Sequence, residues 1–170
     1  MTVNRQMWVH GNAFAPAEAP GPAYFSNINS SLPWTDLVGL HQGYGATWQG
    51  NPNTQNWFHV TVPTPTIADD THLFLDRVYV LYALPTGMFP FIRATVQQIT
   101  VWEGERLLQS FDVGGIGDHC AGPDGSNTFN ITFNQPLSAG GIGISVGVRF
   151  HHSDLSSVRF CGAGAEFTIG

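Results

Sequence analysis

The side chains of this chain that are suited to chemistry gather in two stretches, and the first, from Gly43 to Trp57, is rich in aromatic and amide groups. A sugar ring offers an apolar C–H face and a rim of hydroxyl groups. An aromatic platform with amide donors and acceptors beside it suits both and needs no net charge. The residues from which we expect a ligand site are Tyr44, Trp48, Asn51, Asn53 and Trp57, with Trp34 and Trp102 as extensions of the platform. The alternative is that these tryptophans anchor a core or a subunit interface, where Trp and Tyr are also concentrated.

The second stretch is the glycine-rich segment 114–127, which holds Asp118, His119 and Asp124. Carboxylates and an imidazole on one loop could ligate calcium or a transition metal. The alternative, which we favour, is that the Asp and Gly residues form turns and His119 is exposed. Asp69 and Asp70 with His72 invite the same two interpretations.

One segment matches the sequence of a serine-nucleophile motif but lacks the structural context that this motif requires. Gly143-Ile-Ser145-Val-Gly147 fits Gly-x-Ser-x-Gly, but it lies within strict strand alternation and no helix follows to supply the strained turn. The seven histidines form neither His-x-His nor His-Glu-x-x-His. We therefore do not expect hydrolysis.

The element that organises these residues is the stretch Gly141 to Phe150. Ile142, Ile144, Val146, Val148 and Phe150 occupy every second position, so that one face of a strand is apolar and the other is nearly bare. A bare face lets another backbone or a ligand approach closely. We expect this stretch to be a central strand of an antiparallel sheet.

Other segments show the same period of two. Around Gln97 and Gln98 the hydrophobic parity switches, which predicts a β-bulge, and a second parity break falls at Cys161 and Gly162. From Val78 onward the segment 72–84 is apolar on both faces, which predicts a strand that is covered on both sides.

No stretch has helical periodicity. We predict one all-β domain over 1–170, an antiparallel β-sandwich of jelly-roll type with eight to ten short strands. The N-terminal segment 1–50 is irregular, with a first strand near residues 7–14 and a Pro-rich connection at 15–22.

Charge is sparse, because Asp, Glu, Lys and Arg make up 11% of the chain, where about a quarter is ordinary. The formal net charge is −6 and there are six basic residues, so nucleic acid is not an expected partner. No run of about eighteen apolar residues predicts a membrane span. A sparsely charged sandwich would expose apolar edges as a monomer, and we therefore expect a homo-oligomer.

The two cysteines, Cys120 and Cys161, admit two interpretations. We expect two reduced, partly buried thiols, as is usual for a cytosolic chain. A disulfide that ties the glycine-rich loop to the last strand is the alternative. The chain begins without an apolar stretch behind basic residues, so we expect a cytoplasmic location, with an extracellular one as the alternative.

Several strand patterns carry a resemblance: Trp57-Phe-His-Val-Thr-Val-Pro-Thr-Pro65, Ser126-Asn-Thr-Phe-Asn-Ile131, Gly143-Ile-Ser-Val-Gly-Val-Arg-Phe150 and Ala163-Gly-Ala-Glu-Phe167. Over about residues 55–170 the chain resembles an uncharacterised family of small bacterial β-proteins. That family has no assigned activity, so the resemblance implies a single bacterial-type domain and no particular site residue.

Three functional hypotheses follow. The first is a non-catalytic sandwich that self-assembles or interacts with other proteins. The alternative is a lectin-like module that binds neutral carbohydrate through the aromatic and amide-rich stretch. The third is a metal-dependent enzyme that uses segment 114–127 and requires no cofactor other than calcium or a transition metal.

Overall fold

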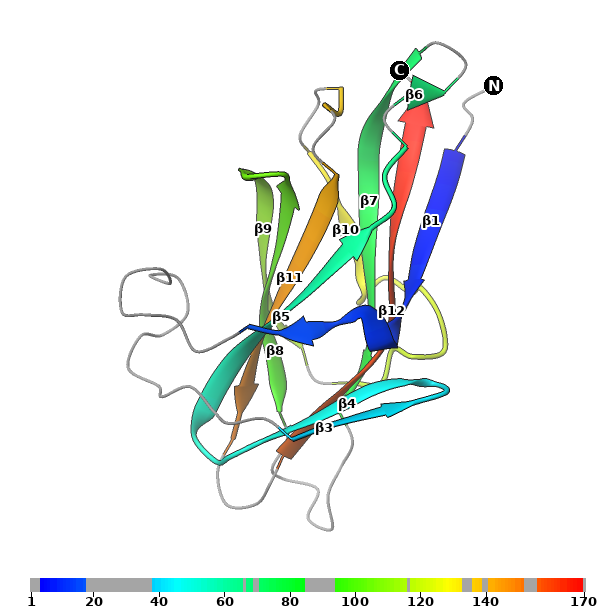
Figure 1. The fold of residues 1–170 in the computed structure, drawn as a ribbon. Coiled ribbons are helices and arrows are strands. Elements are labelled where there is room, and N and C mark those ends of the chain that lie inside the picture. Colours follow the sequence, from blue (N-terminus) through cyan, green and yellow to red (C-terminus); the bar gives the residue numbers. More distant parts are fainter. Residues whose placement is uncertain are drawn as a thin grey trace.

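The structure, a computed structural model, describes residues 4–17, 38–65, 67–68, 71–84, 94–115, 117–132, 136–138, 141–151 and 156–169. They form two antiparallel sheets that pack face to face, which confirms the predicted β-sandwich (Figure 1). Trp34, Asp69 and Asp70 lie outside the described residues. The jelly-roll connectivity stays a prediction.

The first sheet is the larger, with seven strands among the described residues. Its main path runs β10 (Thr128–Asn130), β7 (Thr71–Ala83), β12 (Ser156–Ile169), β4 (Gly45–Gly50) and β3 (Val38–Gln42). In addition, β1 (Asn4–His10) pairs with β12, and β6 (Ile67–Ala68) pairs with β7. β7, β12 and β1 therefore lie side by side, with β1 at an edge (Figure 1).

The second sheet has five strands, and β11 is at its centre. Its order is β2 (Ala15–Pro16), β5 (Thr54–Val62), β11 (Ile142–Phe150), β8 (Thr95–Glu103) and β9 (Arg106–Gly115). Ile144, Val146 and Val148 are fully buried, so the apolar side of β11 faces the core. This confirms the central strand that the sequence predicts.

Both predicted parity breaks are bulges. Along β11, Gly147 pairs with Gln98 but Val148 pairs with Val96, which leaves Gln97 as the extra residue of β8. On β12 the pairing to β7 skips Cys161 in the same way. An extra residue shifts the following side chains to the opposite face, so hydrophobic residues on both sides of each bulge reach the same core.

The N-terminal segment differs from its prediction. The sequence predicts a strand near residues 7–14, but β1 ends at His10 and a short 3₁₀ helix, η1 (Gly11–Ala13), carries the chain from one sheet to the other. Gly11 is needed there, because a Cβ at that position would collide with the Phe160 carbonyl. The crossing places Phe14 in the core, where its ring stacks on Phe160 with centroids 4.1 Å apart. Burial of such a side chain contributes roughly 1.5–3 kcal/mol.

The two cysteines form a disulfide, so the expectation of reduced thiols is wrong and the alternative holds. Cys120 and Cys161 are linked across a Cα–Cα distance of 5.6 Å. The bulge explains the pairing, because Cys161 is the extra residue of β12 and is only half-buried. It fastens the loop that carries Cys120 to the larger sheet.

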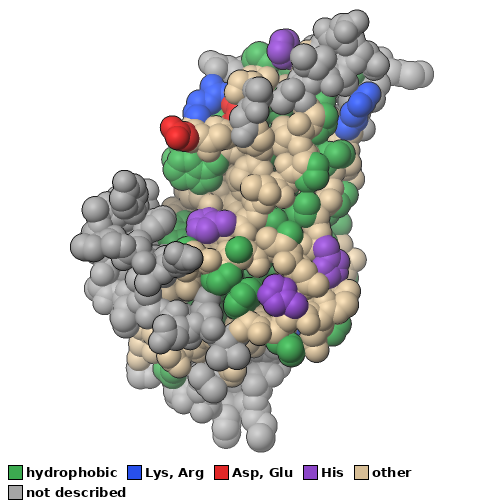
Figure 2. Space-filling model, viewed as in Figure 1, with side chains coloured by type: hydrophobic (Ala, Val, Ile, Leu, Met, Phe, Trp, Pro, Cys, Tyr) green, Lys and Arg blue, Asp and Glu red, His purple; other side chains and the backbone are tan. Residues whose placement is uncertain are grey.

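The described surface is sparse in charge. In the view of Figure 2, Arg, Asp and Glu side chains appear near one end, while histidines and uncharged side chains cover most of the remaining described surface. Within the described residues, no helix is long and apolar enough to cross a bilayer.

Candidate functional site

The structure does not bring the five sequence-predicted ligand residues together. Tyr44 is 50% exposed at the turn between β3 and β4, with the Arg159 guanidinium 4.8 Å from its ring centroid. Trp48 pairs with the buried Val158, so it points to the inner side of the larger sheet, where its ring lies 5.9 Å from that of Phe58. Trp57 is 5% exposed and belongs to the other sheet.

The two predicted asparagines lie in the turn between β4 and β5. Asn53 has a φ of 57°, a conformation that Asn tolerates better than most residues, and the Asn51 carbonyl accepts a 2.6 Å hydrogen bond from Thr54 Oγ1. Both residues therefore shape the chain reversal that joins the two sheets.

The candidate metal ligands form turns within their loop. Asp118 Oδ1 accepts the Cys120 N–H at 3.2 Å, and Asp124 Oδ1 accepts the Ser126 N–H at 2.7 Å. The hydrogen bonds from the Ser126 side chain and backbone, with a further contribution from His119, lower the pKa of Asp124 to about 2. Among the described residues, no group of three or more His, Cys, Asp or Glu is placed to hold a metal ion. A metal at this loop stays a prediction.

A different set of residues meets on the outer side of the five-stranded sheet. Because Ile144, Val146 and Val148 of β11 face the core, Gly143, Ser145 and Gly147 face outward, and the strand register adds their neighbours on both sides. We call this set the β11 face. It consists of three rows: Trp57, Gly147 and Gln98; His59, Ser145 and Thr100; Thr61, Gly143 and Trp102.

Trp102 supplies the aromatic surface of the β11 face. Its indole Nε1 donates a 2.9 Å hydrogen bond to Thr100 Oγ1, two residues earlier on the same strand, which fixes the ring along β8. The ring is half-buried, so some of it remains in contact with solvent. The neighbouring Gly143 leaves open space, because a Cβ there would meet nothing closer than the Trp102 Cβ at 3.9 Å.

Hydrogen-bonding groups line the middle of the face. His59 Nδ1 and Ser145 Oγ are 2.8 Å apart, and Gln98 Nε2 donates to Asp112 Oδ1 at 3.2 Å. Gln98 Oε1 is buried and has no hydrogen-bond partner among the described residues. Burial lowers the pKa of His59, so its imidazole is neutral at pH 7. The middle of the face therefore offers hydroxyl and neutral imidazole groups.

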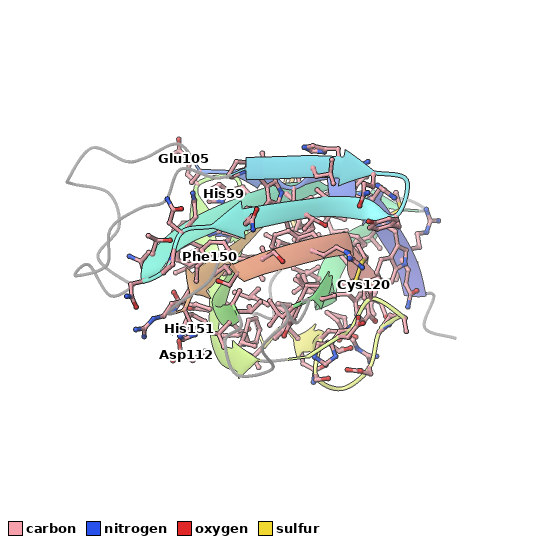
Figure 3. The ribbon with its side chains drawn as sticks, turned by 90° about the horizontal axis from the view of Figure 1, so that it is seen from below. His59, Glu105, Asp112, Cys120, Phe150 and His151 are labelled. Atoms are coloured by element: carbon pink, nitrogen blue, oxygen red, sulfur yellow. A yellow bond between two sulfur atoms is a disulfide. The ribbon has the colours of Figure 1, made fainter. Side chains whose placement is uncertain are left out.

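The far end of the face is closed. Trp57 is almost fully buried, and beyond it His151 Nε2 hydrogen-bonds Thr95 Oγ1. Burial, and then the nearby Arg149, lower the pKa of His151, so this histidine is also neutral at pH 7. His59, Asp112 and His151 lie on one side of the molecule and Cys120 on the other (Figure 3). Because the Trp57 end of the β11 face is closed, the open end is the opposite one, which holds Trp102, Gly143 and Thr61.

The Ser145–His59 pair is not arranged for nucleophilic catalysis. Ser145 lies in the middle of β11, which pairs with β5 on one side and β8 on the other. The backbone N–H groups around it are therefore engaged in the two ladders and cannot stabilise an oxyanion. The arrangement suits binding of hydroxyl groups rather than acyl transfer.

Sequence reasoning named Trp102 and Trp57 but could not place the partners of Trp102. Gln98, Thr100 and Trp102 share a face because they alternate with Ile99 and Val101, which are buried in the core, and this parity can be read from the sequence. The neighbours Thr61 and Gly143 come from strands about 40 positions away on either side along the chain, and only the strand order brings them to Trp102.

No family model and no curated protein matches the chain. Two solved structures are similar to it in the arrangement of strands. One is described as the xylan-binding module CBM15, with a TM-score of 0.48, 12% sequence identity, and coverage of 99% of this chain and 98% of that one. The other is described as the low-affinity xylan-binding module CBM86 of the gut symbiont Roseburia intestinalis, with a TM-score of 0.44, 13% identity, and coverage of 97% and 96%.

Proposed function

We propose that this β-sandwich is a non-catalytic module that binds neutral carbohydrate through the β11 face. The observation that carries the proposal is the position of Trp102, a partly exposed indole fixed along its strand beside the side-chain-free Gly143. A sugar ring can stack on the indole while its hydroxyl rim reaches down toward the backbone of β11.

The polar groups of the face support a neutral, hydroxyl-rich ligand. Ser145, His59 and Thr61 can each exchange a hydrogen bond with a hydroxyl group. His59 is uncharged at pH 7 because burial lowers its pKa. An anionic ligand would find no cation in the open end of the face, which consists of Trp102, Gly143 and Thr61.

Replacement of the platform tests the proposal. In affinity electrophoresis through gels that contain soluble xylan, mannan or mixed-linkage glucan, we expect retardation by at least one polysaccharide. We expect Trp102→Ala to weaken binding about tenfold or more, as loss of an interface tryptophan commonly does. Tyr44→Ala is the matched control, because Tyr44 is an exposed aromatic outside the β11 face. Migration unaffected by all three polysaccharides would overturn the proposal, as would loss of binding in Tyr44→Ala alone.

A second proposal is that the protein self-associates. Its support is the charge content of 11% together with two exposed leucines on edge strands, Leu40 on β3 and Leu107 on β9. Exposed apolar residues on sheet edges favour pairing between chains. Light scattering at micromolar concentration is expected to give a mass above that of one chain, and a mass of 18.4 kDa would overturn this proposal.

The disulfide supports an extracellular setting over the cytoplasmic one expected from the sequence. Structural disulfides persist in oxidising compartments and are rare in the cytosol. The Cys120–Cys161 link is therefore more compatible with a module that meets polysaccharide outside the cell.

A further inference from the structure

A second tryptophan lies on the opposite side of the sandwich, on the outer face of the seven-stranded sheet. Trp8 of β1 is 39% exposed, whereas Tyr79 of β7 is nearly buried. The two rings stack with centroids 5.1 Å apart and an interplanar angle of 20°. The exposed aromatic surface at this place is therefore mainly that of Trp8.

The Trp8 indole packs against a glycine of β12, the strand between β1 and β7. Gly164 of β12 pairs with Trp8 on one side and with Tyr79 on the other. A Cβ at Gly164 would lie 2.6 Å from Trp8 Cε3, so the indole rests directly on the glycine backbone as it reaches Tyr79. One side of the indole is thus packed against the protein, and the exposed remainder faces solvent.

A hydrogen-bonded polar cluster adjoins the ring in the next row of the sheet. Glu166 is 3% exposed, and its Oε2 accepts hydrogen bonds from Tyr79 Oη at 2.6 Å and from Gln6 Nε2 at 3.0 Å. Arg77 pairs with Glu166 across the strands, and the Glu166 carboxylate raises the pKa of Arg77. Arg77 also forms an ion pair with Asp76, whose Oδ2 lies 3.0 Å from Arg77 Nε, so the cluster is polar and contains charges of both signs.

We propose that Trp8 is a second carbohydrate platform and that the protein therefore binds two saccharide chains at once. The ligand class, a neutral saccharide, rests on the proposed function, whereas the position of the second site does not. Trp8 and Trp102 lie on the outer sides of different sheets with the core between them, so one chain cannot stack on both in an extended conformation.

The surroundings of Trp8 favour a saccharide over a protein partner. A specific protein interface buries about 800 Å² on each side and has an apolar centre. Here a single indole is bordered by Gln6, Glu166 and Arg77. One flat ring with hydrogen-bonding groups beside it matches the C–H face and hydroxyl rim of one sugar unit.

A bridging assay tests the second platform. Insoluble xylan, mannan and cellulose are incubated with the protein and a fluorescent soluble form of the same polysaccharide, and the fluorescence retained on the solid is measured. We expect the wild-type protein to retain it. Trp8→Ala and Trp102→Ala should each still bind the solid through the remaining platform, more weakly than the wild-type protein, but lose bridging at least fivefold, and the double variant should not bind. Trp8→Phe, which keeps an aromatic ring, should preserve some of the bridging, and thermal unfolding of each variant verifies the fold.

The outcomes separate the two proposals. Full bridging by Trp8→Ala overturns the second platform. Binding that is lost in Trp102→Ala and unchanged in Trp8→Ala also overturns it and leaves the β11 face in place. Binding that is lost in Trp8→Ala and unchanged in Trp102→Ala overturns the β11 face and the simultaneous binding of two chains, and leaves Trp8 as the platform. Absence of wild-type binding to all three solids overturns both.

Discussion

At the scale of single residues, the ionisation state of His59 links the β11 face to stability. The imidazole is partly buried next to Ser145, and burial lowers its pKa from the ordinary value of 6.5. At pH values between the lowered pKa of His59 in the folded protein and its ordinary pKa in the unfolded chain, the unfolded chain binds more protons. The free energy of unfolding therefore falls as the pH falls. His151 contributes with the same sign because its pKa is also lowered, by burial and by Arg149.

We predict that the free energy of unfolding decreases as the pH is lowered from about 7.5 to about 5, through the ordinary histidine pKa. In urea denaturation at these two pH values, His59→Asn should lose less stability than the wild-type protein, because Asn has no proton to take up. Asp124 and Glu103 do not interfere in this window, because the pKa of each carboxyl lies below its ordinary acidic value. An equal pH dependence in both proteins would contradict the assignment.

A second residue-scale prediction concerns Glu103, which is 4% exposed at the end of β8. Its carboxylate pairs with Arg106 and accepts hydrogen bonds from the Ser138 N–H and from Ser138 Oγ, the latter at 2.8 Å. Burial alone would raise the pKa of Glu103, but these hydrogen bonds lower it. Glu103→Gln should reduce the unfolding free energy by about 1–3 kcal/mol. The amide of Gln has one acceptor oxygen in place of two, so its NH₂ group would face either Arg106 or Ser138, which are both donors.

Glu105→Gln is the control, since Glu105 is exposed at the hairpin turn two residues away. Chemical denaturation should show a change within about 0.5 kcal/mol for this variant. Equal effects of the two substitutions would mean that the Ser138 contacts do not stabilise the fold.

At the scale of elements, alternation allows the strands and both bulges to be predicted from the sequence. The side-chain period of two is a local property, so the parity switches at Gln97 and Cys161 are visible without any knowledge of the fold. The crossing at η1 cannot be predicted in this way, because Gly11 is required only by the position of the Phe160 carbonyl, which is far along the chain. The pairing of Cys120 with Cys161 is equally non-local, and the sequence alone favours the wrong alternative.

The disulfide gives a prediction for the loop that carries Cys120. The two cysteines are 41 positions apart, and in the chain-entropy treatment closing a loop of that length contributes about 4 kcal/mol. The double variant Cys120→Ser, Cys161→Ser should lose most of that stability in guanidinium denaturation. Reduction of the wild-type protein should have a similar effect, and a loss below about 1 kcal/mol in both experiments would contradict this account.

At the scale of the whole molecule, the sequence does not give the place of the site that we propose. Aromatic and amide residues suggest a surface for neutral sugars, but Tyr44, Trp48 and Trp57 are distributed over two sheets and three different faces. Each tryptophan that the structure leaves partly open on an outer face, Trp8 and Trp102, adjoins a glycine of a neighbouring strand. Strand order is a non-local property, and it decides which aromatic rings remain exposed on an outer face.

The most direct test of the β11 face is a titration of the ¹⁵N-labelled protein with a soluble neutral oligosaccharide from the polysaccharide retained in the gel assay, followed by the indole N–H signals. The chain has five tryptophans, and Trp102→Phe assigns the signal of interest. The Nε1–H of Trp102 is hydrogen-bonded at the site itself, so its signal should shift in a saturable manner while that of Trp48, on the inner side of the larger sheet, stays in place. A Trp102 signal that does not move under saturating ligand would contradict the account.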